Sequence, residues 1–339
     1  MPKNNTPQEI WDAIMASKNP ICCIDSRFDF DAFGSALALK EVMKEHVKDL
    51  ALTFDGQIPD KAKEMLDVSS VKTEMPPSEV DFSNYDLLIF LDSGNLEHIS
   101  KTDNFSVPEG LKTVNIDHHA GNPFYGDLNY VIGGACSTCS VLYDILIALS
   151  LKINEKTAKY LLTGHVTDSG FFQYSCVKSD DLRKAADLMD FGASFFDISW
   201  HLNFAETEDD YRYRTIVYKN LKVVKGKGYA YSTVLSSELN ELKVDLNKVG
   251  AKASNLIDKL EGVDFVFVVK DSLLDDGSKA YNVSFRSHNP DFSVLPLAVA
   301  LDGGGHKMAA GGTVTGVDNI NLATEKVIST IDSCNQNSF

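Results

Sequence analysis

Three short apolar segments, each followed at once by an aspartate, do most to constrain the fold of this chain. The segments are residues 20–24, 85–91 and 111–116, and the acids that follow them are Asp25, Asp92 and Asp117. The second segment is an almost continuous apolar run, which is typical of a parallel strand buried on both faces. Because ligands of an open parallel sheet bind beyond the carboxyl ends of its strands, we expect these acids to lie at a binding edge.

Further acids lie close to these strand ends or at the end of a helix. Asp29 and Asp31 are two residues apart in the segment that leads from the first strand into a predicted helix. They can turn toward one point, although capping of the helix is a common role for such residues. Asp168 lies near the last turn of a helix predicted over residues 154–167, where its charge opposes the helix dipole and requires a cation. A metal ion would supply that charge.

Two adjacent histidines, His118 and His119, come directly after Asp117. Carboxylates together with imidazole suit a divalent metal of the manganese, iron or zinc type. On its own, this triplet would also fit an exposed loop with two surface histidines. The acids expected at the same edge favour the metal site.

The composition limits the classes of function. The 339 residues suffice for two domains, each with its own core. A formal net charge of −16 argues against a protein that binds long nucleic acid through its phosphates, which requires a basic surface. No signal peptide and no apolar run of the roughly 18 residues that a membrane helix needs are visible, so we expect a cytoplasmic protein. The sequence leaves open whether the chain forms homodimers.

A charged segment at residues 205–210 marks the end of the first predicted domain, residues 1–204. We expect a linker helix over residues 205–218 and a smaller domain of mixed α/β structure over residues 219–335. In that domain, residues 303–307 have the sequence Gly-Gly-Gly-His-Lys. Consecutive glycines allow backbone amides to approach an anion closely, although a flexible turn is an alternative. Arg286 ends a neighbouring predicted strand and favours anion binding, because its planar guanidinium fits a phosphate.

Six segments, in this order, resemble the motifs of the DHH phosphoesterase superfamily, in its RecJ-like branch of short-oligonucleotide and nucleotide phosphatases. The segments are residues 29–35, 92, 117–119, 167–171, 284–287 and 303–306. The resemblance implies an α/β protein with a parallel-sheet DHH domain and a smaller, mixed α/β substrate domain. It also implies an active site in the cleft between the two domains.

Two divalent metal ions, usually manganese, are a further implication of the resemblance. The ligands carried over are Asp29 and Asp92 for one ion, and Asp31, Asp92, His118 and Asp168 for the other. Asp117 would orient its neighbours, and His119 would face the scissile phosphate. The other end of the substrate would be bound by Arg286, Ser287, Gly304, Gly305 and His306.

One residue departs from the pattern of the family. Many relatives have a histidine four residues before Asp29, as a ligand of the first ion, and this chain has Asp25 there. If Asp25 binds metal, five carboxylates oppose the four positive charges of two ions, which would weaken phosphate binding or alter the metal preference. Alternatively, Asp25 turns away and the first ion is weakly held.

We therefore predict a metal-dependent phosphoesterase that hydrolyses short oligonucleotides, 3′-phosphoadenosine 5′-phosphate, or both. One alternative is an exopolyphosphatase, pyrophosphatase or cyclic-dinucleotide phosphodiesterase of the same superfamily. Another is a nucleotide-binding protein whose turnover is impaired by Asp25. The expected partner is a short nucleic acid or a nucleotide, and neither a long duplex nor a membrane.

Overall fold

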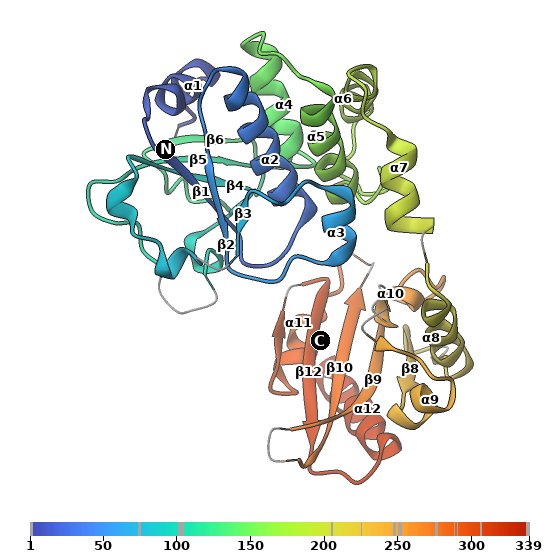
Figure 1. The fold of residues 1–339 in the computed structure, drawn as a ribbon. Helices are drawn as coiled ribbons and strands as arrows, with labels where there is room; N and C mark the ends of the chain where they lie inside the picture. The colour runs from blue at the N-terminus through green and yellow to red at the C-terminus, as the bar shows by residue number, and fades with distance from the viewer. Residues whose placement is uncertain are drawn as a thin grey trace. The chain divides into compact units, whose positions relative to one another are not determined.

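The chain folds into two units, residues 1–204 and residues 205–339, each with its own six-stranded sheet (Figure 1). The computed structural model describes residues 3–73, 76–100, 105–204, 206–224, 226–246, 249, 253–274, 277–287, 289, 291–305 and 307–336. Among the helices of these residues, none combines the length and apolar character needed to cross a membrane.

The sheet of the first unit is entirely parallel, in the order β3-β2-β1-β4-β5-β6. Its strands are β1 Pro20–Ile24, β2 Ala51–Phe54, β3 Val71–Lys72, β4 Leu87–Leu91, β5 Lys112–Asp117 and β6 Leu128–Val131. Every residue of β1 and β4 is buried, because both strands lie inside the sheet and are covered on both faces. The short edge strands β3 and β6 were not predicted.

Helices cover one face of this sheet and irregular segments cover the other. The helices of the unit are α1 Pro7–Ala16, α2 Phe30–Glu45, α3 Asp60–Met65, α4 Thr138–Ala148, α5 Glu155–Asp168, α6 Ser179–Asp190 and α7 Phe195–Ser199, with short turns η1 Pro77–Glu79, η2 Phe82–Asn84, η3 Leu96–His98 and η4 Trp200–Phe204. Cys22 and Ile89 pack in the larger core with the helices. Their neighbours Ile21 and Leu88 point to the opposite face and a smaller core. This alternation is the period of two that a strand imposes.

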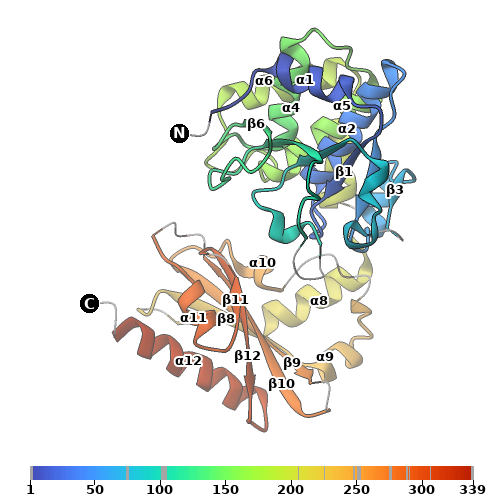
Figure 2. The same cartoon turned by 90° about the vertical axis from the view of Figure 1, so that its left-hand side faces the viewer.

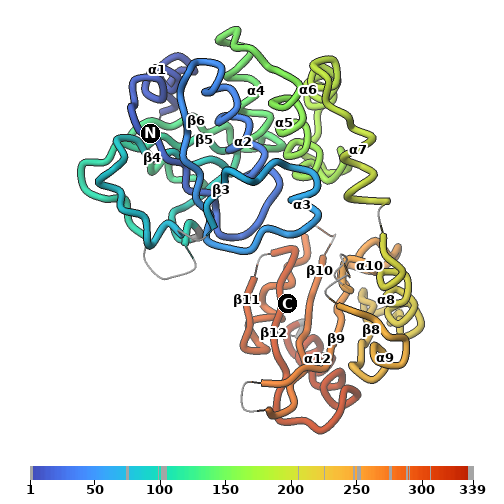
Figure 3. The backbone as a smooth tube through the Cα atoms, in the orientation of Figure 1, coloured from blue at the N-terminus to red at the C-terminus, as the bar shows by residue number. Residues whose placement is uncertain are grey.

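Two glycines allow α2 and α5 to pack closely, and the course of both helices can be followed in Figure 3. A Cβ atom on Gly34 would lie 2.6 Å from the carbonyl oxygen of Tyr160. A Cβ atom on Gly164 would lie 2.7 Å from Oδ1 of Asp31. The close approach brings the first turn of α2 to the end of α5, where Asp168 lies.

The second unit contains a mixed sheet in the order β11-β12-β10-β9-β8-β7, in which only β8 and β9 are parallel among the described pairs. Its elements are α8 Glu208–Lys219, β7 Lys222–Val224, β8 Tyr229–Val234, α9 Ser236–Glu241, α10 Ala253–Ile257, β9 Phe265–Leu273, β10 Lys279–Ser287, α11 Leu295–Val299, β11 Gly304–Gly305, β12 Ala309–Thr315 and α12 Ile320–Gln336. α12 packs on one face of the sheet and α8 on the other (Figure 2). The predicted fold class, a parallel-sheet unit with a separate mixed unit, is confirmed.

The segment predicted as a linker helix, residues 205–218, contains nearly all of α8. α8 begins at Glu208, and Thr207 caps it by accepting a hydrogen bond from the backbone N–H of Asp210 over 3.2 Å. Glu208, Asp209 and Asp210 of the charged segment form the first turn of this helix, where negative side chains are favourable. Because Ile216 and Val217 of α8 are buried in the core of the second unit, this helix is part of that core and not only a connection.

Candidate metal centre

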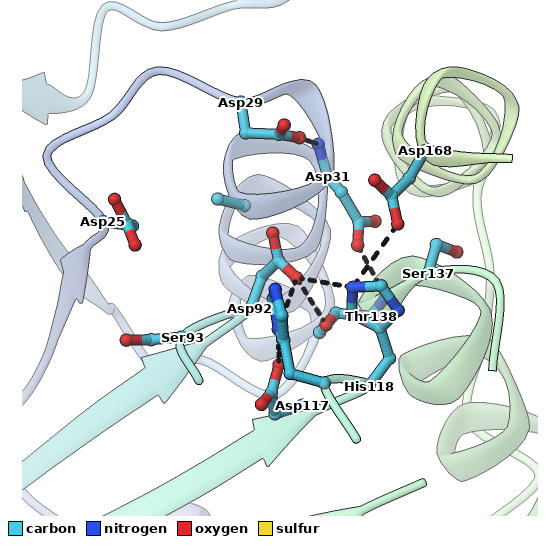
Figure 4. A network of polar contacts seen from close by, with 12 residues as sticks. Asp25, Asp29, Asp31, Asp92, Ser93, Asp117, His118, Ser137, Thr138 and Asp168 are labelled. Carbon is cyan, nitrogen blue, oxygen red and sulfur yellow. Dashed lines mark hydrogen bonds and ion pairs between the residues drawn. The ribbon is translucent and has the colours of Figure 1, made fainter. Parts of the chain in front are cut away.

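Four side chains from separate elements converge at the carboxyl edge of the parallel sheet (Figure 4). They are Asp31 from α2, Asp92 after β4, His118 after β5 and Asp168 at the end of α5. Nε2 of His118 lies 3.3 Å from Oδ1 of Asp92 and 3.4 Å from Oδ2 of Asp168. Single ligand atoms of Asp31, His118 and Asp168 all lie within 4.8 Å of one another. One ion can contact all three atoms at this separation.

The N-terminus of α4 holds Asp31 in place. The backbone N–H of Thr138 donates to Oδ2 of Asp31 over 2.6 Å, and that of Cys139 donates to Oδ1 over 2.9 Å. The positive end of the helix dipole also favours the carboxylate. Asp29 caps α2 by accepting a hydrogen bond from the backbone N–H of Asp31 over 2.7 Å. Helix capping was one of the two roles predicted for Asp29. Its second carboxylate oxygen has no hydrogen-bond partner among the described residues.

Asp92 follows β4 in an unusual backbone conformation. Its φ of +57° lies in the left-handed region, which aspartate tolerates better than most residues. The backbone N–H of Asp92 still donates to the carbonyl of Ile116 on the adjacent strand, over 3.1 Å. The chain therefore turns sharply at Asp92 while its side chain stays anchored at the sheet edge.

The ring of His118 is oriented by a backbone group. Nδ1 of His118 lies 2.9 Å from the carbonyl oxygen of Ala135. Because a carbonyl can only accept a hydrogen bond, Nδ1 carries a proton. Nε2 consequently faces the carboxylates of Asp92 and Asp168, which is the arrangement of a histidine that binds metal.

Crowding of buried charges shifts the pKa values of this cluster. Burial and neighbouring negative charges raise the pKa values of Asp31 and Asp92. Burial, followed by the charge of Asp31, raises the pKa of Asp168 to about 7. Burial opposes protonation of His118, but its hydrogen bond to Asp92 and the surrounding carboxylates raise its pKa to about 10. In the absence of a cation, the cluster therefore retains protons that a divalent ion would displace.

Asp117 supports His119 beside this cluster. Oδ1 of Asp117 lies 2.7 Å from Nδ1 of His119, and Oδ2 accepts a hydrogen bond from Nδ2 of Asn122 over 2.6 Å. The hydrogen bond that Nδ1 of His119 donates to Asp117 raises the pKa of His119. Burial opposes ionisation of Asp117, but its hydrogen bonds lower its pKa below the usual value. The side chain of His119 is 46% exposed, so its other nitrogen is available to a ligand.

Asp25 is engaged elsewhere. Both of its carboxylate oxygens bind Arg27, through Nε over 3.1 Å and through a terminal nitrogen over 2.8 Å. Among the described residues, two groups of ligand atoms converge: one from Asp31, His118 and Asp168, the other from Asp92, Asp117, His118 and His119. Asp25 belongs to neither group, and neither does Asp29. With the charge of Asp25 offset by Arg27, the remaining carboxylates are Asp29, Asp31, Asp92 and Asp168, which balance the four positive charges of two divalent ions.

In the second unit, the predicted substrate residues lie on β10 and β11. Arg286 donates from Nε to Oδ1 of Asn255 over 3.0 Å, and Ser287 donates from Oγ to the carbonyl of Asp264 over 3.1 Å. Gly304 and Gly305 pair with β12 as a short strand, so they do not form an open loop. His306 lies outside the described residues.

Several supporting residues were not predicted. Thr138, Asn122 and Arg27 each bind a carboxylate of the site, yet none belongs to a recognisable metal-binding pattern. Thr138 directly follows Ser137, which caps α4. His165 is fully buried and hydrogen-bonded to Ser137 over 2.9 Å, so it is a packed histidine.

Comparisons with known proteins agree with this architecture. The sequence matches the DHH family, N-terminal domain, over residues 21–165 and the DHHA1 domain over residues 226–333. The chain belongs to the DHH family. Family membership implies the use of divalent metal, and the four carboxylates and one imidazole described above are a suitable donor set for it.

Individual relatives in this family span most of the chain. The bifunctional oligoribonuclease and PAP phosphatase NrnA of Bacillus subtilis (strain 168) is 28% identical over 305 residues, which cover 85% of this chain and 87% of that protein. The protein of the same name from Thermus thermophilus is 28% identical over 310 residues, covering 89% and 86%. The crystal structure of an exopolyphosphatase-related protein from Bacteroides fragilis superposes with a TM-score of 0.83 at 19% identity, covering 96% of this chain and 95% of that one. This last similarity shows a shared fold.

Proposed function

We propose that this protein is a metal-dependent phosphoesterase that hydrolyses short oligonucleotides, 3′-phosphoadenosine 5′-phosphate, or both. The observation that carries the proposal is the convergence of Asp31, Asp92, His118 and Asp168 into one cluster whose pKa values are shifted. Relatives named oligoribonuclease and PAP phosphatase, at modest identity over most of both chains, support this substrate class. The net charge of −16 favours a short substrate over a long one.

Two divalent cations would lower the pKa of a water nucleophile and neutralise charge on the phosphate. Manganese suits the oxygen-rich donor set. The family motifs assign Asp29 and Asp92 to one of the two cations, and Asp31, Asp92, His118 and Asp168 to the other. Within the second set, ligand atoms of Asp31, His118 and Asp168 lie within 4.8 Å of one another. Oδ1 of Asp92 accepts a hydrogen bond from Thr138 and lies 3.3 Å from Nε2 of His118, and these two contacts fix the orientation of the carboxylate.

His119 would act on the substrate directly. Its Nδ1 is committed to Asp117, which leaves Nε2 for the phosphate or the leaving oxygen. The hydrogen bond that Nδ1 donates to Asp117 raises the pKa of His119, which favours the ring that also carries a proton on Nε2. His119 would donate that proton as the leaving alkoxide departs. Arg286 would bind a more distant part of the substrate through its guanidinium.

A turnover assay tests the proposal. Purified protein loaded with manganese is incubated with a labelled diribonucleotide, 3′-phosphoadenosine 5′-phosphate, inorganic polyphosphate and a cyclic dinucleotide, with a metal-free sample as control. We expect metal-dependent hydrolysis of the first two substrates. Hydrolysis of polyphosphate or of the cyclic dinucleotide alone would establish the alternative specificity, and binding of nucleotide without turnover under any divalent metal would refute catalysis.

A further inference from the structure

Arg27 is held rigidly at the sheet edge by Asp25. The carboxylate of Asp25 accepts from the backbone N–H of Arg27 over 2.9 Å, from Nε over 3.1 Å and from one terminal nitrogen over 2.8 Å. A two-pronged guanidinium–carboxylate pair fixes the plane of the guanidinium. The Asp25 side chain is 6% exposed, whereas that of Arg27 is 55% exposed. The carboxylate is therefore buried, and the guanidinium faces solvent.

The guanidinium of Arg27 has donors to spare. A guanidinium carries more N–H groups than Asp25 engages. Among the described residues, the second terminal nitrogen of Arg27 makes no hydrogen bond, and Asp25 is its sole side-chain partner. A fixed cation with unused donors that face solvent is suited to bind an oxyanion.

Arg27 also lies beside the metal centre. β1 and β4 are adjacent, and the register that pairs Cys22 with Ile89, continued to the strand ends, brings Asp25 level with Asp92. The hydrogen bond to Asp25 raises the pKa of Arg27, and the charges of Asp92 and Asp29 raise it further. Arg27 therefore follows the strand next to β4, at the same sheet edge as the two acids proposed to hold one of the ions.

We propose that Arg27 is a phosphate-binding residue of this site and that Asp25 is the residue that positions it. The proposal deepens, and rests on, the proposed phosphoesterase function. The ligand is a phosphate oxyanion of a mono- or diester, bound on the side of the centre formed by Asp29 and Asp92. Asp25 thus contributes by orienting a cation, in place of binding metal.

Binding of inorganic phosphate to the manganese-loaded, full-length protein tests the proposal by calorimetry. In Arg27→Ala we expect phosphate affinity to fall about 10- to 100-fold, because a charge-assisted hydrogen bond is lost, with manganese affinity unchanged. The melting temperature should also fall, because the buried carboxylate of Asp25 loses its partner. In Arg27→Lys we expect a smaller loss, because lysine keeps the charge and loses the two-pronged geometry. Arg183→Ala removes an exposed arginine of the same unit, whose side chain bonds Ser179 of its own helix, and serves as the matched control.

Asp25→Asn separates positioning from simple charge. Removal of a nearby negative charge alone would tighten phosphate binding, so weaker binding in this variant supports positioning and tighter binding overturns it. Unchanged phosphate affinity in Arg27→Ala, or an equal loss of manganese affinity, would show that the pair is structural only. A protein that binds phosphate through Arg27 but hydrolyses none of the substrates would refute the proposed enzyme and leave this inference standing.

Discussion

Thr138 donates its hydroxyl hydrogen to Oδ1 of Asp92 over 2.9 Å, which ties the N-terminus of α4 to the end of β4. The backbone N–H of the same residue binds Asp31. One residue thus fixes two of the proposed metal ligands, which arrive from different elements. Groups that orient metal ligands in this way contribute strongly to metal affinity.

Replacement of Thr138 by valine should therefore weaken manganese binding about 10-fold or more, because Asp92 loses its partner while the shape of the side chain is kept. Titration calorimetry measures the effect. Thr138→Ser keeps the hydroxyl and is the control, with an affinity close to that of the wild type. Equal manganese affinity in the valine variant would show that Thr138 does not set the geometry of Asp92.

Manganese binding should release protons and tighten as pH rises. The pKa of Asp168 is raised to about 7 and that of His118 to about 10, so both groups hold protons that an ion must displace. At about pH 6 both are largely protonated, as is Asp31, whose pKa is raised to about 8. At about pH 8 Asp168 has mostly lost its proton and Asp31 has lost part of its own, so fewer protons are released at the higher pH. Calorimetry in two buffers of different ionisation enthalpy counts these protons. A manganese affinity that does not change between the two pH values would contradict the coupling of manganese binding to proton release.

His119→Ala should lower kcat about 100- to 10,000-fold, the usual range for loss of a general acid. Manganese affinity should remain near that of the wild type, because Nδ1 of His119 is bound to Asp117. Steady-state kinetics and calorimetry together make the distinction. His201→Ala is the matched control, since the ring of His201 bonds the carbonyl of Asp197 within its own helical segment.

The ends of the strands could be predicted because they depend on local pattern. The buried run of β4 and the acid after it are visible in the sequence, and parallel pairing then brings Asp92 and His118 to one edge. The same logic failed for β6, which has only four residues at the sheet edge and buries Asn129 and Val131 in alternation. A short edge strand carries too little apolar signal to be distinguished from a loop.

Side-chain partners within the site could not be predicted. The sequence left open whether Asp25 would bind metal, and the outcome depends on the rotamer of Arg27, two residues away. The support of Asp31 by α4 joins residues more than a hundred positions apart, through backbone N–H groups that any residue possesses. Residue type alone therefore carries no information about this contact.

The close packing of α2 on α5 yields a last prediction. In Gly164→Ala the new Cβ would lie 2.7 Å from Oδ1 of Asp31 and would also contact the sulfur of Cys139. Forcing a methyl group into a packed contact destabilises a protein by about 1–3 kcal/mol, and here it would also displace a metal ligand. We expect both a lower melting temperature and weaker manganese binding. Gly121→Ala, where no atom lies within 4 Å of the new Cβ, is the control and should change neither. A Gly164→Ala variant with a lower melting temperature but an unchanged manganese affinity would show that the packing of Gly164 does not position Asp31 as a metal ligand.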